Sequence, residues 1–257
     1  MDATTLGDLL EERAAADGDL DDPGAALRAP GDPERCYDAA RLRADSRKTG
    51  NFLRQLGVGP GRTVAIADRP RPESILSLFG TALLGGRARY VPQDGSDTEA
   101  SGGIDARVLV GPTDRLEGIS TTAATKRLGY GRAPDDPETA YFEQEVWSEN
   151  PTFPPSDIEG ETVAIETSDE SYTHREIVVA AERIVGERSL DPGTEVVVRA
   201  PLADVRAVVG VLAPLASDGT IVVPDSGTEG DLAVVAGDGK VPEPTTIGVA
   251  DVPLGNV

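Results

Sequence analysis

Residues 162–177, TVAIETSDESYTHREI, carry the hydroxyl and imidazole groups that could contact a phosphate. A short apolar strand, a polar turn and a helix start follow one another, the setting in which a phosphate-binding loop is expected. Such a loop turns backbone N–H groups onto phosphate oxygens, which requires glycine, and it often adds a lysine. This turn has neither, and Asp169 and Glu170 would repel phosphate. The candidate binding residues are Thr167, Ser168, Thr173 and His174.

Cysteine and histidine, the other residue types that could do chemistry, occur once each, as Cys36 and His174. No disulfide can form within the chain, and a zinc site made of Cys and His is excluded. A lone cysteine is most often a small buried hydrophobe, and a lone histidine beside a helix start is most often structural or solvated. The Walker, GxGxxG, GxSxG and HExxH motifs are also absent from the sequence. We therefore predict no catalytic residue and no metal site.

Charge limits the partners of the protein. The 257 residues include 45 acidic and 24 basic ones, so the formal net charge is −21, and the acidic residues are spread along the chain. Nucleic acid is disfavoured because phosphate backbones need clustered positive charge. Dispersed acid with lysine only at Lys48, Lys126 and Lys240 favours adaptation to molar salt, with an ordinary acidic cytosolic protein as the alternative. No apolar run approaches the ~20 residues of a membrane span, so we expect a soluble, cytoplasmic protein without membrane contact.

The elements that must position these groups occur twice. Residues 37–94 and 172–226 share the order tyrosine, capped helix, Pro-Gly turn, β-branched strand, second helix and a strand that ends in Val-Pro. Thr173, with Glu176 three residues later, predicts a capping box at the start of the first helix of the second repeat. This alternation predicts an α/β fold of two pseudo-repeated αβ subdomains with largely parallel sheets. The matched positions are Tyr37 with Tyr172, Pro60-Gly61 with Pro192-Gly193, Pro70 with Pro201, and Val91-Pro92 with Val223-Pro224.

Four segments resemble a known family. They read LGVGPGRTVAI from residue 56, ALLGGRARYVPQD from residue 82, FEQEVWSENP from residue 142 and APLADVRAVVGVLAPLASDGTIVVP from residue 200. In this order and spacing they resemble the N-terminal region of AMP-dependent synthetases and ligases, the acyl-CoA synthetase or adenylate-forming superfamily. The resemblance implies a first αβ subdomain over 1–130, a Pro- and acid-rich interdomain segment over 131–160, ordered around Phe142, Val146 and Trp147, and a truncated second subdomain over 161–257.

The departures from the family fall on its functional motifs. Where the family has YTSGTTGxPKG followed by TH, this chain has ETSDESYTH. Thr167-Ser168 and Thr173-His174 match the two ends of that motif, or else the segment is a plain hairpin like ALRAPGDPERCYDAARL before the first repeat. Asp204 replaces the histidine of the family's PLFH, and the sequence contains no YGxTE motif. Lys240 lacks the context of the family's C-terminal catalytic lysine.

These departures favour a degenerate, non-catalytic ligase-like protein that acts as a binding, regulatory or assembly subunit without a cofactor. One alternative is an acyl-CoA synthetase-like acid–thiol ligase or nucleotide-binding subunit that uses ATP or AMP, Mg and CoA together with a partner chain. A second alternative is a structural α/β protein without a ligand. The resemblance implies a homo-oligomer or a ligase-like partner subunit, because the family's large domain continues further and an apolar surface or sheet edge around 231–250 would need cover. The acyl substrate cannot be read from the sequence.

Overall fold

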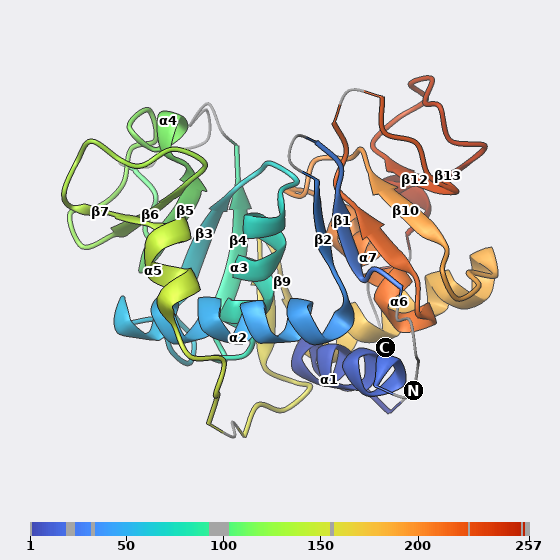
Figure 1. The fold of residues 1–257 in the computed structure, drawn as a ribbon, viewed down its shortest axis with the longest axis horizontal. Helices are drawn as coiled ribbons and strands as arrows, with labels where there is room; N and C mark the ends of the chain where they lie inside the picture. Colours follow the sequence, from blue (N-terminus) through green and yellow to red (C-terminus); the bar gives the residue numbers. More distant parts are fainter. Residues whose placement is uncertain are drawn as a thin grey trace.

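Helices and strands alternate along most of the chain in this computed structural model, which describes residues 2–18, 24–31, 34–92, 103–154, 157–225, 227–252 and 254. Gln93 and Asp94 of the family-like motif lie outside the described residues. Figure 1 shows two sheets beside each other, with the first in the left half of the view and the second in the right half. The elements are α1 (Leu6–Asp17), β1 (Leu27–Ala29), β2 (Arg35–Tyr37), α2 (Ala39–Gln55), β3 (Thr63–Ala67), α3 (Pro72–Ala82), β4 (Arg87–Val91), β5 (Val108–Pro112), α4 (Thr113–Leu116), β6 (Lys126–Tyr130), β7 (Thr139–Tyr141), α5 (Phe142–Ser148), β8 (Val163–Glu166), β9 (Ser171–Thr173), α6 (His174–Arg188), β10 (Glu195–Val198), α7 (Val205–Leu212), η2 (Ala213–Ser217), β11 (Thr220–Val222), β12 (Leu232–Val235), β13 (Thr245–Gly248) and η3 (Val249–Asp251).

The two sheets repeat one strand order. The first sheet runs β7-β6-β5-β3-β4-β8-β9 and the second runs β13-β12-β10-β11-β1-β2. Apart from the extra strand β7, each position in one sheet has a counterpart in the other. Neighbouring strands are parallel except for the β1–β2 and β8–β9 hairpins. The α/β fold with two pseudo-repeated, largely parallel sheets is therefore confirmed.

The hairpins are exchanged between the repeats. The β1–β2 hairpin precedes the first repeat along the chain, yet β1 pairs with β11 of the second sheet, with Leu27 opposite Ile221. The β8–β9 hairpin precedes the second repeat, yet β8 pairs with β4 of the first sheet, with Ile165 opposite Ala88. Strand pairing thus crosses the predicted boundary between the subdomains in both directions, and the division of the chain into subdomains remains a prediction.

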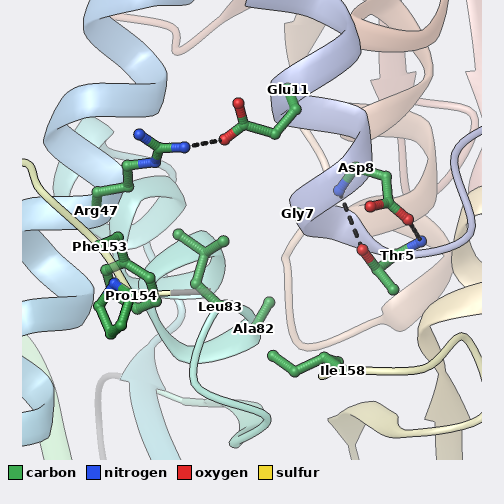
Figure 2. Close-up of a pocket in the computed structure, with 10 residues that line it drawn as sticks. All are labelled: Thr5, Gly7, Asp8, Glu11, Arg47, Ala82, Leu83, Phe153, Pro154 and Ile158. Atoms are coloured by element: carbon green, nitrogen blue, oxygen red, sulfur yellow. Dashed lines mark hydrogen bonds and ion pairs between the residues drawn. The ribbon is translucent and has the colours of Figure 1, made fainter. Parts of the chain in front are cut away.

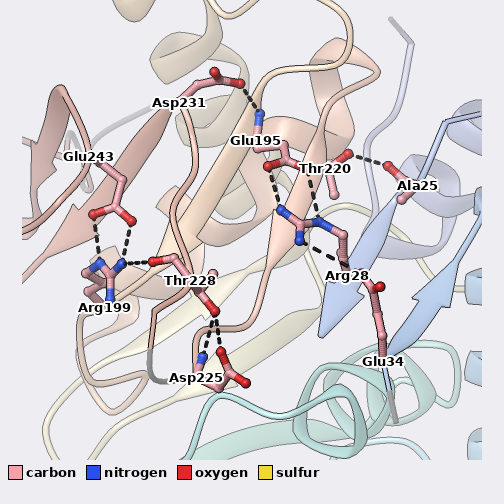
Figure 3. A network of polar contacts seen from close by, with 10 residues as sticks. All are labelled: Ala25, Arg28, Glu34, Glu195, Arg199, Thr220, Asp225, Thr228, Asp231 and Glu243. Carbon is pink, nitrogen blue, oxygen red and sulfur yellow. Dashed lines mark hydrogen bonds and ion pairs between the residues drawn. The ribbon is translucent and has the colours of Figure 1, made fainter. Parts of the chain in front are cut away.

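Polar contacts hold each exchanged hairpin in its sheet. Figure 3 shows Arg28 of β1 reaching Glu195 of β10, with its Nε and Nη2 atoms 3.0 and 2.6 Å from the carboxylate oxygens. In the other repeat the corresponding contact joins Glu166 of β8 to the hydroxyl of Thr63 on β3, at 2.8 Å. In both cases the contact passes over the intervening strand, so the hairpin is tied to the sheet by more than its own ladder.

The turns before the matched strands also agree in detail. The backbone N–H of Gly61 donates to the carbonyl of Gly85 at 2.8 Å, and that of Gly193 donates to Asp218 at 2.9 Å. Gly85 and Asp218 both have positive φ angles, of 64° and 55°. Glycine takes this left-handed conformation without steric cost, and aspartate is among the few other residues that tolerate it.

The segment predicted to join the subdomains belongs in large part to the first sheet. Its strand β7 pairs with β6, and helix α5 follows directly. Phe142 and Val146 are fully buried, and Trp147 packs edge-on against Phe142 with ring centroids 5.5 Å apart. Phe142 and Val146 belong to the main hydrophobic cluster of the protein and Trp147 packs against that cluster, which accounts for the order of this segment.

The main hydrophobic core lies between the sheets. Alternate residues of the central strands, such as Val64 of β3 and Val196 of β10, belong to one buried cluster with helices α1, α2, α3, α6 and α7. Smaller clusters lie on the opposite faces, around Ala65 of β3 and Val197 of β10. In the part of the chain that the structure describes, no helix is long and apolar enough to cross a lipid bilayer.

Candidate functional site

The predicted turn is a hairpin connection in which the side chain of Thr167 bonds to the backbone of the turn. Residues 167–170 join β8 to β9, which pair antiparallel. The N–H of Thr167 donates to the carbonyl of Glu170 at 2.8 Å. The hydroxyl oxygen of Thr167 accepts the N–H groups of Asp169 and Glu170 at 3.3 and 3.0 Å. These amides therefore point at Thr167, whereas a phosphate loop would present them to a ligand.

The charges of this turn are unfavourable for phosphate. Ser168, Asp169 and Glu170 are exposed, and the hydroxyl of Ser168 donates to the Asp169 carboxylate at 3.0 Å. Tyr172 donates its hydroxyl to the carboxylate of Glu170. The two exposed carboxylates of Asp169 and Glu170 repel a phosphate group by Coulomb interaction. The turn follows a strand and precedes a helix, as a phosphate loop does. Its amides are bonded to Thr167, however, and its charged side chains are acidic.

Thr173 caps helix α6. Its hydroxyl accepts the N–H of Glu176 at 3.2 Å, and the Glu176 carboxylate accepts the backbone N–H and the hydroxyl of Thr173 at 2.7 and 2.9 Å. This is the predicted capping box, which satisfies amides that the first helical turn leaves without partners. The Thr173 hydroxyl is thus committed to the helix start.

His174 is a buried structural residue. Its side chain has no solvent exposure, and its Nδ1 atom accepts the N–H of Leu6, the first residue of α1, at 3.2 Å. Burial lowers the pKa of His174 to about 4, against the opposing attraction of Asp8. The imidazole is therefore neutral near pH 7 and joins α1 to the second repeat. Its Nε2 atom has no partner among the described residues.

A cavity of about 340 Å³ lies beside the β8–β9 turn. It takes in Thr167 and Ser168, but neither Thr173 nor His174. The predicted site residues are therefore split into a pair at the turn and a pair at the start of α6. The cavity is lined by Arg89, Tyr90, Val91, Pro92, Gly103, Ile104, Asp105, Thr167, Ser168 and Ala203.

The loop before α7 is fixed from the first sheet. The carboxylate of Asp68, just after β3, accepts the N–H of Leu202 at 2.6 Å. Burial raises the pKa of Asp68 in spite of this bond and one from the N–H of Ala203. Asp204, which the sequence resemblance aligns with a histidine of the family, accepts the N–H of Arg206 at 3.0 Å as the cap of α7. Its role here is local and structural.

Another cavity, of about 300 Å³, lies at the N-terminus of α1 (Figure 2). Figure 2 shows that its polar groups are paired with one another: Thr5 with Asp8 as a capping box, and Glu11 with Arg47 at 2.5 Å. Such pairing leaves little for a ligand to satisfy, so we regard this cavity as a packing gap. Within the described ranges, no group of three or more His, Cys, Asp or Glu side chains could hold a metal ion.

Sequence reasoning missed a cluster of arginines. Arg69 and Arg71 follow strand β3 and line a further cavity together with Arg35 from the β1–β2 hairpin. The sequence held a signal, because Arg69-Pro70-Arg71 directly follows an apolar strand whose carboxyl end would lie at a sheet edge.

Comparison with solved structures identifies the fold. The anthranilate CoA ligase AuaEII in complex with anthranoyl-AMP is similar with a TM-score of 0.72 and 16% identity, over 90% of this chain and 49% of that one. The nonribosomal peptide synthetase FmoA3 is similar with a TM-score of 0.69 and 16% identity, and the match covers 86% of this chain and 22% of that one. The N-terminal domain of FACL13 from Mycobacterium tuberculosis is similar with a TM-score of 0.68 and 16% identity, and the match covers 86% of this chain and 57% of that one. The chain has the fold of the N-terminal region of adenylate-forming ligases.

This likeness confirms, at the level of the fold, the resemblance predicted from the four sequence segments. No protein-family model and no curated protein sequence matches the chain. The adenylate-forming fold spans nearly the whole chain, which in turn spans about half or less of the AuaEII and FmoA3 chains, 49% and 22%. What those larger proteins do is carried over only as a proposal.

Proposed function

We propose that this chain is a non-catalytic form of the adenylate-forming ligase fold and acts as a binding, regulatory or assembly subunit. The observation that carries the proposal is the closed β8–β9 turn. The hydroxyl of Thr167 occupies the N–H groups of Asp169 and Glu170, which a triphosphate would need. Opening the turn would expose two carboxylates to the phosphate, so ATP binding would cost both hydrogen bonds and Coulomb energy.

Ligand-induced stabilisation tests this proposal. Thermal unfolding is followed in molar KCl with ATP plus magnesium, with AMP and with CoA. A ligand present at 100 times its dissociation constant stabilises by about 2.7 kcal/mol, which raises the midpoint of a chain of this size by roughly 5–10 °C. We expect no rise with ATP or AMP.

A matched variant makes the result specific to the turn. Ser168→Ala removes an exposed hydroxyl that contacts only Asp169 among the described side chains, so it should leave the fold intact. A rise of the midpoint with ATP that disappears in Ser168→Ala would contradict the proposal. That result would favour the alternative, a ligase or nucleotide-binding subunit that works with a partner chain.

We further propose where a second copy of the chain or a ligase-like partner would bind. Strand β13 is at the edge of the second sheet, and its Thr245 and Thr246 side chains are exposed. The apolar residues nearby, including Ile247 and Val249, are already buried within the chain. The partner would therefore add a strand through backbone hydrogen bonds, with little apolar burial. Proline disfavours strand pairing, so light scattering on Thr246→Pro should show loss of the assembly that we expect for the unaltered chain. A strict monomer for the unaltered chain would contradict this proposal.

A further inference from the structure

A cavity of about 550 Å³ opens at the carboxyl ends of β3, β5 and β6. We call it the arginine pocket. One side comes from the first sheet, and the other comes from residues 29–31 and Arg35 at the tip of the exchanged β1–β2 hairpin, which stands at the same edge in Figure 1. Ligands of parallel α/β sheets bind at this edge, in cavities of about 300–1,000 Å³. The lining residues are Ala29, Pro30, Gly31, Arg35, Arg69, Arg71, Glu73, Pro112, Asp114, Tyr130, Gly131, Arg132 and Glu143.

Two guanidinium groups in the arginine pocket have no partner in the part of the chain that the structure describes. The side chains of Arg69 and Arg71 are half-buried and make no hydrogen bond or ion pair with a described residue. This is unexpected in a chain with 45 acidic and 24 basic residues, where carboxylates are abundant. Helix α3 begins directly after Arg71, so the positive end of its dipole adds to the same potential.

The third arginine is held in place and frames the pocket. Arg35 of β2 forms an ion pair with Glu73 of α3, with a second contact of 3.4 Å between Nη2 and Oε2. Glu73 is 2% exposed, so the pair is shielded from water on the carboxylate side. Arg35 belongs to β2 of the second sheet, and Glu73 belongs to α3, which packs with the first sheet. The ion pair therefore holds the two sides of the arginine pocket together.

Two buried polar atoms in the lining have no hydrogen-bond partner among the residues that the structure describes. The Tyr130 side chain is 5% exposed, and its hydroxyl makes no hydrogen bond with any described residue. The same holds for Oε2 of Glu143, whose Oε1 accepts the N–H of Gly131 at 2.7 Å. Burial raises the pKa of both groups, while Arg69 and Arg71 lie near enough to Tyr130 to oppose the shift there. Buried polar atoms are almost always hydrogen-bonded, so these two indicate a missing partner.

We propose that the arginine pocket binds a small organic anion, whose carboxylate or phosphate group lies between Arg69 and Arg71 and accepts the hydroxyl of Tyr130. The planar guanidinium group donates two parallel hydrogen bonds to either kind of anion. The apolar lining of Ala29, Pro30 and Pro112 suits a short carbon skeleton. Glu143 then accepts a hydroxyl group at the other end of the ligand.

Calorimetric titration with 4-hydroxybutyrate and with inorganic phosphate tests the proposal on the full chain. We expect saturable binding of at least one probe, weakened about tenfold or more by Arg69→Gln and by Arg71→Gln, since a hydrogen bond to a charged group contributes more than a neutral one. The control is Arg62→Gln, which changes the net charge equally but lies at the amino end of β3 and is exposed. It should bind as the unaltered chain does.

Tyr130→Phe separates binding from folding. Removing a buried hydroxyl without a partner should leave the unfolding midpoint of the free protein unchanged or raise it. The same variant should bind the anion more weakly, which a purely structural role of Tyr130 would not produce. Tighter binding of 4-hydroxybutyrate assigns the site to carboxylic acids, and tighter binding of phosphate assigns it to phosphate esters.

Two results would overturn the proposal: no binding of either probe, or an equal loss in Arg62→Gln and in the pocket variants, which would reduce the effect to net charge. Neither would affect the proposed loss of catalysis, which rests on the β8–β9 turn and not on this pocket.

Discussion

The buried histidine makes stability depend on pH in a way that can be calculated. His174 accepts the N–H of Leu6 through Nδ1 and has no exposure to solvent. His174→Asn is the perturbation of choice, because the side-chain oxygen of asparagine can accept the same N–H but carries no titrating group. The variant leaves a small gap, whose cost does not change with pH.

The size of the effect follows from the two pKa values. In the unfolded chain His174 has a pKa near 6.5, and burial lowers it to about 4 in the folded protein. Between these values the unfolded state binds the proton and the folded state does not. The free energy of unfolding is therefore highest, as far as His174 determines it, above about pH 6.5, and it decreases as the pH falls toward 4. The difference of about 2.5 corresponds to about 3 kcal/mol, at 1.36 kcal/mol for each pKa unit.

Urea unfolding at several pH values between about 4 and 7 measures this term. The carboxylates also titrate in this range, but they contribute equally to both proteins and cancel in the difference. The free energy of unfolding of the unaltered chain minus that of His174→Asn should therefore fall by about 3 kcal/mol from pH 7 to pH 4. A difference that stays constant over this range would refute the description of His174 as a buried, neutral residue.

Two further predictions concern packing and charge. Gly80→Ala should destabilise by about 1–3 kcal/mol in chemical unfolding, because the added Cβ would lie 2.8 Å from the Gly50 nitrogen and 3.1 Å from the Thr49 Cβ where α3 meets α2. Gly186→Ala in α6, where nothing lies within 4 Å, should instead stabilise by up to about 1 kcal/mol, so equal effects of the two variants would contradict the packing. The net charge of −21 predicts that the unfolding midpoint rises with KCl well beyond about 0.5 M, and a midpoint independent of KCl would contradict adaptation to salt.

Local structure was predictable because its signals are local. The apolar runs at 63–67 and 195–198 became central strands, and the capping pair of Thr173 and Glu176 began a helix at the expected residue. Matching turn residues also revealed the repeat. The hairpin form of the β8–β9 turn was one of the two interpretations of a segment that lacks glycine and lysine, and the antiparallel pairing of β8 with β9 agrees with it.

Long-range pairing was not predictable. Nothing in the pattern of residues 27–37 tells which sheet edge the hairpin will join, and its contact between Arg28 and Glu195 spans 167 positions. The hydrogen bond from Leu6 to His174 spans 168. Arg69 and Tyr130 likewise acquire their shared setting only when the ends of β3 and β6 meet at one edge of the sheet. A single sequence carries no signal for contacts of this kind.

The central claim is that this chain has the adenylate-forming fold without the chemistry. Exchange of pyrophosphate into ATP that depends on an added carboxylic acid measures adenylate formation directly. The assay uses the purified chain with magnesium in molar KCl and a panel of short and long acids. Loss of one electrostatic contact to a transition state typically lowers the rate by about 10²- to 10³-fold. In the turn, the amides of Asp169 and Glu170 are bonded to Thr167, and residues 167–170 include no lysine or arginine. We predict exchange no faster than in buffer, and acid-dependent exchange above that control that is abolished in Ser168→Ala would contradict the account.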